Sequence, residues 1–186
     1  MERAWRVAHA VYDQSMSDIT ESPTADISRL ADLTRDIRVA MMTTFPPGRQ
    51  PHSRPMYTTG VDAKNFDGTL WFMSHAESLK NDELSENPAV LLTYAAPDKN
   101  RYVVVYGAGK VERNPEKARE LWNVHAKGWF PGGPDDPALR LIRCEVSSAE
   151  YWDGPSNTSY FLSLLSAVAT GTTPKTKGEH GKVSGH

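Results

Sequence analysis

The stretch HSRPMYTTGVDAKNFDGTLWFMSHAESLK, residues 52–80, predicts a strand, a turn, a second strand and the start of a helix. Arg54 lies on the first strand, and Ser78 and Lys80 lie where the helix begins. Backbone amides at a helix start are unpaired donors, and the helix dipole favours an anion there. The stretch therefore suggests a bound phosphate group. From local spacing alone a plainer interpretation fits better: Ser78 caps the helix and Lys80 is solvated.

Further segments rich in β-branched and aromatic residues predict strands on both sides of this stretch. With 52–59 and 69–74, the predicted strands are 37–44, 89–96, 101–113 and 139–152. Short helices are predicted at 26–35, between a Ser74–Glu77 capping box and residue 86, and from an Asn114-Pro115 start to residue 125. Short turns join most strands, so we predict a mainly β (α+β) fold: a six-stranded antiparallel β-barrel with short flanking helices.

The ends of the chain have weaker patterns than the middle. We expect a poorly ordered arm over residues 1–25, one domain over 26–155, and a C-terminal helix over 156–170 with an apolar stripe. Residues 171–186 carry three lysines, one glutamate and no apolar cluster, which predicts a disordered tail.

Composition excludes several classes of protein. The 21 basic and 23 acidic residues nearly cancel, which does not indicate a nucleic-acid or membrane-surface partner. A single cysteine, Cys144, excludes a disulfide within the chain, and no secretory apolar run is present, so we expect a cytoplasmic setting. No stretch approaches the roughly 20 apolar residues of a membrane helix. The histidines show no zinc-binding spacing, so no metal site is predicted.

The order of several motifs is more specific than any one of them. The segment SLKNDELSENPAVLLTY, residues 78–94, resembles the pyridoxamine 5′-phosphate oxidase superfamily, the FMN-binding split barrels, in its Ser-x-Lys, Glu-Leu and Asn-Pro elements. Ser53-Arg54-Pro55-Met56 is similar to the flavin-contacting strand of that family. The branch that fits best is the general stress protein 26 group, on the motifs Leu70-Trp71-Phe72, Trp129-Phe130-Pro131, Asp135-Asp136-Pro137 and Tyr151-Trp152-Asp153. The resemblance covers residues 28–155.

The resemblance implies a split barrel that forms a homodimer, with FMN in a cleft between the subunits. Carried over position by position, three groups of residues would contact the cofactor: Arg54, Pro55, Met56 and Tyr57 along the flavin, Met73 and Ser74 at the isoalloxazine and ribityl groups, and Ser78, Leu79 and Lys80 at the phosphate. Trp129, in a Gly- and Pro-rich loop, would cover the flavin ring or pack across the dimer. The Asp135-Asp136 pair is better explained by turn formation than by acid–base catalysis.

Departures from the oxidase pattern bear on activity. Leu79 stands where the oxidase has an arginine, Thr59 where it has a substrate-binding lysine, and Tyr102 where it has a glutamine. Pyridoxamine phosphate oxidation is therefore not expected. The resemblance implies an FMN-dependent oxidoreductase related to stress, with a nicotinamide electron donor. Two alternatives stay open: an FMN-storing or redox-sensing protein without turnover, and a split barrel that holds a deazaflavin or haem.

Overall fold

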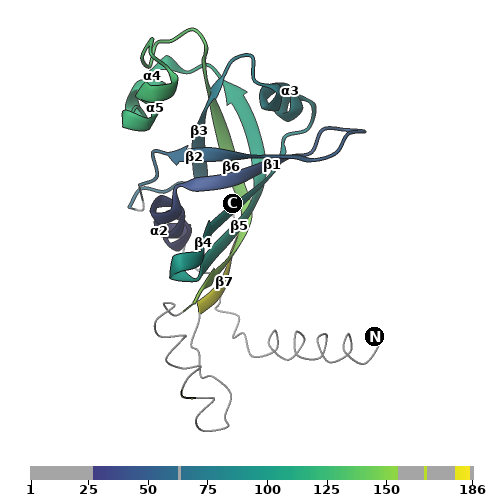
Figure 1. The fold of residues 1–186 in the computed structure, drawn as a ribbon, viewed down its shortest axis with the longest axis vertical. Helices are drawn as coiled ribbons and strands as arrows, with labels where there is room; N and C mark the ends of the chain where they lie inside the picture. Colours follow the sequence, from purple (N-terminus) through teal and green to yellow (C-terminus); the bar gives the residue numbers. More distant parts are fainter. Residues whose placement is uncertain (1–26, 63, 155–165, 167–178, 185–186) are drawn as a thin grey trace.

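The computed structural model describes residues 27–62, 64–154, 166 and 179–184, and its centre is an antiparallel sheet that closes on itself (Figure 1). The strands of the barrel are β1 (Val39–Thr44), β2 (His52–Thr59), β3 (Thr69–His75), β4 (Ala89–Ala96), β5 (Arg101–Glu112) and β6 (Leu139–Asp153). Their order is β3-β2-β1-β4-β5-β6, and β3 pairs with β6 to complete the ring. The predicted six-stranded antiparallel barrel is confirmed.

Alternating side chains fill the interior of the barrel. Every second residue of β1 and β4 is buried, and Met42, Leu92 and Tyr94 expose none of their surface. Successive side chains of a strand point to opposite faces, so the residues between them, such as Met41, lie on the outer face. Each buried large apolar side chain contributes about 1.5–3 kcal/mol to folding, which makes this interior the main source of stability.

Short helices flank the barrel in the described ranges: α2 (Ile27–Ile37), α3 (Leu79–Glu86), the 3-10 helix η1 (Pro97–Lys99), α4 (Pro115–Glu120) and α5 (Val124–Trp129). In Figure 1, α3 and the α4–α5 pair lie toward one end of the barrel, and α2 lies toward the other end. The helix predicted from Asn114 to residue 125 is in fact two helices. It is interrupted because Asn123 starts a new helix, accepting a hydrogen bond from the backbone N–H of Ala126 and donating to Thr59.

The predicted capping box at Ser74 does not form. Ser74 is still part of β3, and its buried hydroxyl donates to Asn81 Oδ1 at 2.9 Å. Helix α3 begins later, at Leu79, with Ser78 in the N-cap position. The local pattern was misleading because a tertiary contact uses the Ser74 hydroxyl.

Strands β2 and β3 separate after a short region of pairing. They pair only at Thr58↔Phe72 and Thr59↔Trp71. The rest of β2 pairs with β1 alone, and β3 continues to pair with β6 as far as His75. This leaves a gap between two strand edges, which we call the split: it is bordered by residues 52–57 of β2 and 73–75 of β3.

The tail contains a strand that the sequence did not predict. Residues Glu179–Ser184 form β7, which pairs antiparallel with the second half of β6, from Ser148 to Asp153. The prediction of disorder over residues 171–186 is therefore wrong for this strand. Gly181 explains the docking: it lies against the ring of Tyr151, where any side chain would overlap the phenol. The predicted arm over 1–25 lies outside the described residues, as does the predicted helix over 156–170 apart from Ser166.

Candidate functional site

A buried carboxylate organises the polar residues at the α3 end of β2. Glu83 of α3 is fully buried and accepts hydrogen bonds from Thr44 Oγ1 at 2.6 Å and from Arg54 Nη2 at 2.8 Å. His52 Nδ1 contacts the second carboxylate oxygen. His52 and Arg54 reach Glu83 together because residues two apart on a strand share a face. We call these four residues the Glu83 cluster.

Glu83 carries a negative charge in this setting. Burial alone would raise its pKa, but hydrogen bonds from Thr44, His52 and Arg54 outweigh burial and hold the pKa below its ordinary value. A buried carboxylate of this kind needs such partners, because removing a charge from water is costly.

The start of α3 brings a second cation next to the cluster. Lys80 Nζ donates to Ser78 Oγ at 2.5 Å, while Ser78 makes no side-chain capping bond to the helix. The pKa of Lys80 is lowered, first by burial and then by the positive charge of Arg54, and Glu83 opposes these effects. The plainer interpretation of a capping Ser78 beside a solvated Lys80 is thus not what the structure contains. The structure places Ser78 and Lys80 beside the Glu83 cluster, which contains Arg54, and the role of these residues at a phosphate stays a prediction.

The split presents unpaired backbone groups next to these cations. The N–H of Thr58 donates across β1 to the carbonyl of Arg38 at 2.7 Å. Since backbone groups alternate in direction along a strand, Ser53, Pro55 and Tyr57 turn theirs away from β1 and into the split. Pro55 therefore costs no hydrogen bond of the β1–β2 ladder, which explains how a proline fits inside a strand.

The other predicted contact residues border the split in different ways. Met56 packs in the barrel interior, and Met73 packs under α4 and α5. Ser74 is buried, and its partner Asn81 donates to the carbonyls of His75 at 2.8 Å and Ala76 at 3.0 Å. Asn81 thereby fixes the turn from β3 into α3. The side chain of Leu79 is exposed.

Aromatic stacks attach α5 near both borders of the split. Tyr57 stacks on His125 with ring centroids 4.1 Å apart, and His75 stacks on Phe130 at 5.3 Å. Trp129, the last residue of α5, is 74% exposed, and among the described residues it makes no hydrogen bond or ring contact with the Glu83 cluster. The structure therefore does not bring Trp129 into the predicted site within one subunit.

Sequence reasoning missed the partners that hold Arg54. Glu83 entered only as a letter of a motif, and Thr44 and Asn81 were not considered as site residues. The period-2 pattern of β2 was a usable signal, because it places His52 beside Arg54. Nothing local indicated that α3 would place a carboxylate between them.

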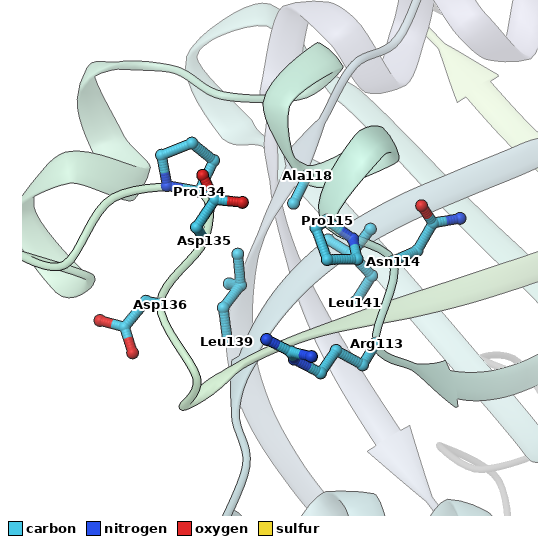
Figure 2. Close-up of a pocket in the computed structure, with 9 residues that line it drawn as sticks. All are labelled: Arg113, Asn114, Pro115, Ala118, Pro134, Asp135, Asp136, Leu139 and Leu141. Atoms are coloured by element: carbon cyan, nitrogen blue, oxygen red, sulfur yellow. The ribbon is translucent and has the colours of Figure 1, made fainter.

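The hollow at α4 is too small for a cofactor. Figure 2 shows it enclosed by residues that follow β5, by α4 and by the loop before β6; its volume is about 10 Å³, which is room for about one water molecule. Asp136 accepts hydrogen bonds from the backbone of Ala138 and Gly132, and Asp135 pairs with Arg119. These contacts agree with the predicted turn role of the acidic pair. A larger hollow of about 390 Å³ lies between α3, β5 and β6, lined by residues that include Leu84, Lys110 and Arg143.

The one cysteine of the chain is not set up as a nucleophile. Burial raises the pKa of Cys144 to about 12, so this thiol stays protonated at neutral pH and is a poor nucleophile.

Within the described ranges, no helix has the length and apolarity that crossing a bilayer requires.

Comparison with known proteins gives consistent relatives. The chain is 24% identical over 147 residues to the protein bli-3 of Neurospora crassa, which covers 75% of the chain and 65% of that relative. A structure described as general stress protein 26 from Jannaschia sp. CCS1 superposes with a TM-score of 0.69 at 22% identity, covering 85% of this chain and 96% of the other. The general stress FMN/FAD binding protein of Xanthomonas citri gives a TM-score of 0.59 at 21% identity, covering 68% and 87%.

At these identities the solved structures establish the fold alone. Membership of a family comes from its sequence profile, described as "Pyridoxamine 5'-phosphate oxidase like", which matches residues 25–175 of the 186. This chain belongs to the pyridoxamine 5′-phosphate oxidase-like family.

Proposed function

We propose that the protein binds FMN along the split and acts as a flavin-dependent oxidoreductase. The observation that carries the proposal is the placement of two neighbouring cations, Arg54 and Lys80, at one end of a gap lined by unpaired strand edges. Like charges held together in a half-buried site repel each other, and an anion between them relieves that repulsion. A phosphate monoester has the charge and the acceptor oxygens for this position.

The donor set fits a phosphorylated flavin in its two parts. Arg54, Ser78, Lys80 and the start of α3 would hold the phosphate. The backbone groups of Ser53, Pro55 and Tyr57 would hydrogen-bond to the polar edge of a planar heterocycle. When bound, FMN supplies the hydride and electron chemistry, and the chain binds it, orients it and sets its electrostatic environment.

The structure gives a physical reason against the oxidase's substrate. Thr59, which stands at the position of the oxidase's lysine, is buried and donates to the carbonyl of Leu121 at 3.0 Å while it accepts from Asn123 at 2.8 Å. Its hydroxyl is thus used in holding α4 and α5 to β2. We infer that the substrate is not pyridoxamine phosphate.

A second subunit is part of the proposal. The outer face of the barrel exposes large side chains on β1, β5 and β6, among them Val39 (47%), Met41 (43%), Tyr106 (48%) and Trp152 (36%). Exposed apolar side chains on the outside of a sheet are typical of a protein interface. A homodimer through this face would shield the flavin from water, since a single subunit leaves the split open. We also propose a role in stress, because proteins of similar fold are described as general stress proteins.

One observation favours a second candidate, FMN storage or sensing without turnover. The histidines beside the split, His75 and His125, are both packed in ring stacks, and neither pairs with an acidic side chain among the described residues. In the part of the chain that the structure describes, these two histidines are therefore not arranged with an acid as a proton-donating pair.

Anaerobic mixing distinguishes the two candidates. Purified protein loaded with FMN is mixed with NADH or NADPH, and the flavin absorbance is followed. Rapid bleaching supports the oxidoreductase; a spectrum unchanged over long incubation supports storage or sensing. A protein that takes up no added FMN would overturn both. If that protein is coloured as isolated, mass spectrometry of the bound chromophore would test for a deazaflavin or haem.

A further inference from the structure

The guanidinium of Arg54 is held by only one of its edges. Nη1 donates to Thr44 Oγ1 at 2.7 Å and Nη2 donates to Glu83 Oε2 at 2.8 Å. These two acceptors are hydrogen-bonded to each other at 2.6 Å, so they lie side by side. They therefore occupy the end of the guanidinium, the edge formed by Nη1 and Nη2. A weaker contact from Nη1 reaches the carbonyl of Met42 at 3.4 Å.

The other edge of the guanidinium makes no hydrogen bond to any residue that the structure describes. This side edge consists of Nε–H and the outer hydrogen of Nη2, and Arg54 keeps 22% of its side chain exposed. Two parallel N–H groups at this spacing match two oxygens of a phosphate or carboxylate. Arg54 therefore has a free two-donor fork whose direction is fixed by the groups at its other edge.

Glu83 also makes the pair of cations tolerable. Arg54 and Lys80 would together place two positive charges in a half-buried site, and Glu83 reduces the sum of the three to one. Thr44 and Glu83 are both fully buried, so their geometry is set by the packing of β1 and α3 rather than by solvent. The arrangement is in place before any ligand arrives, which lowers the cost of ordering Arg54 on binding.

We propose that Glu83, together with Thr44, is a positioning residue: the two lock the end of the Arg54 fork and direct its free side edge at the terminal phosphate of the bound flavin. The proposal rests on the proposed function, because it assigns how this chain selects a phosphorylated flavin. Neither residue touches the ligand itself.

The test compares FMN with riboflavin, which lacks the phosphate. Dissociation constants for both are measured by flavin fluorescence titration, and the ratio of riboflavin to FMN constants reports the phosphate preference. Thr44→Val and Glu83→Leu remove the acceptors without changing Arg54, and each should reduce the ratio by about tenfold, the effect of one charge-assisted hydrogen bond. Glu83→Gln keeps an acceptor oxygen and should retain most of the preference.

Glu86→Gln is the matched control. It removes the same charge from the same helix, but Glu86 is exposed and pairs with Arg49 instead of Arg54. Its ratio should equal that of the unaltered protein. If Glu83→Leu does not fold, Thr44→Val decides alone, because valine has nearly the shape of threonine.

The outcomes separate this inference from the proposed function. Unaltered protein that binds neither flavin overturns the proposed function and this inference with it, and equal affinity for the two flavins overturns the phosphate site. A clear preference for FMN that survives both Thr44→Val and Glu83→Leu overturns the positioning role alone. A loss in Glu83→Gln as large as in Glu83→Leu also overturns it, because charge and not the directed hydrogen bond would then be responsible.

Discussion

At each end of the barrel a largely buried arginine pairs with a carboxylate, but the two arginines differ in how many of their N–H groups the protein occupies. At the end near β7, Arg101 donates from Nε and Nη2 to Asp153 at 2.9 and 3.0 Å, and from Nη1 to Asp36 at 2.9 Å. Every edge of that guanidinium is occupied by protein. Arg54, at the α3 end, has protein acceptors on the end of its fork only.

We propose that this difference separates a structural arginine from a ligand-binding one. Arg29, Asp36, Arg101 and Asp153 form a cluster that joins β5 and β6 to α2. The hydrogen bonds of this Asp153 cluster therefore stabilise the fold. The pKa of Arg101 is raised, chiefly by its hydrogen bond to Asp153. The Glu83 cluster instead leaves donors unused beside a gap between strands. An unoccupied guanidinium edge alone does not identify a ligand site, since Arg29 Nε also has no partner among the described residues; at Arg54 the free edge lies beside Lys80 and the split.

The largest effect on stability is expected from Asp153→Ala, at the end of the barrel near β7. The substitution leaves Arg101 and Arg29 without their common carboxylate, and removing one partner of a largely buried pair costs about 3 kcal/mol of folding free energy. Urea unfolding measures the loss. Asp36→Ala, which removes only an exposed partner of Arg101, should cost less than about 1 kcal/mol. Equal losses in the two variants would contradict the structural assignment.

Lys80→Ala tests the α3 end of the barrel, and it should change ligand binding rather than stability. FMN binding should weaken by about 1.5–3 kcal/mol, the range for hydrogen bonds to charged groups, while riboflavin binding and unfolding change little. Calorimetric titration gives both affinities. Lys99→Ala, an exposed lysine in η1 far along the chain from the cluster, is the control. FMN affinity that is the same in Lys80→Ala and the unaltered protein would remove Lys80 from the phosphate site.

A smaller effect on stability is expected where β7 pairs with β6. Glu179 of β7 pairs with Arg29 at 3.1 Å and accepts from Tyr151 at 3.2 Å. A Cβ at position 181 would lie 2.4 Å from the Tyr151 hydroxyl, so Gly181→Ala forces β7 or the ring to shift. Overpacking of this kind at a strand near the end of the chain should cost about 1 kcal/mol. Hydrogen exchange of the β7 amides checks it: faster exchange is expected there, with no change in β1–β4.

The sequence predicted much of the barrel because its signals are local. Alternating β-branched and aromatic residues marked all six barrel strands, and for β2 the prediction of 52–59 matches the observed His52–Thr59. β7 was missed because its docking depends on the absence of a side chain at Gly181 against Tyr151, a contact between strands that no composition rule detects. In the same way, the break between α4 and α5 depends on Asn123 meeting Thr59.

Strand and helix patterns led to Arg54, Ser78 and Lys80 as candidate phosphate contacts, a role that stays a prediction. The same patterns did not lead to Glu83. Glu83 was not recognised as the partner of Arg54, because that contact needs the distance from α3 to β2, which only the closed barrel fixes. Trp129 shows the converse limit: a motif placed it at the cofactor, whereas one subunit leaves it exposed on α5.

Acid titration should give the smallest difference between the two ends. The folded-state pKa of Glu83 lies below its ordinary value, so its ionised form adds stability above that ordinary pKa, and this stability is lost as the pH falls through the folded pKa. Urea midpoints of the unaltered protein and of Glu83→Gln, measured at about pH 6 and about pH 3.5, should therefore converge on acidification. The variant keeps the other carboxylates, including Asp153, and so removes their contribution from the comparison. Parallel curves would mean that folding does not favour the Glu83 carboxylate over its protonated form, which would contradict the hydrogen bonds from Thr44, His52 and Arg54 that lower its pKa.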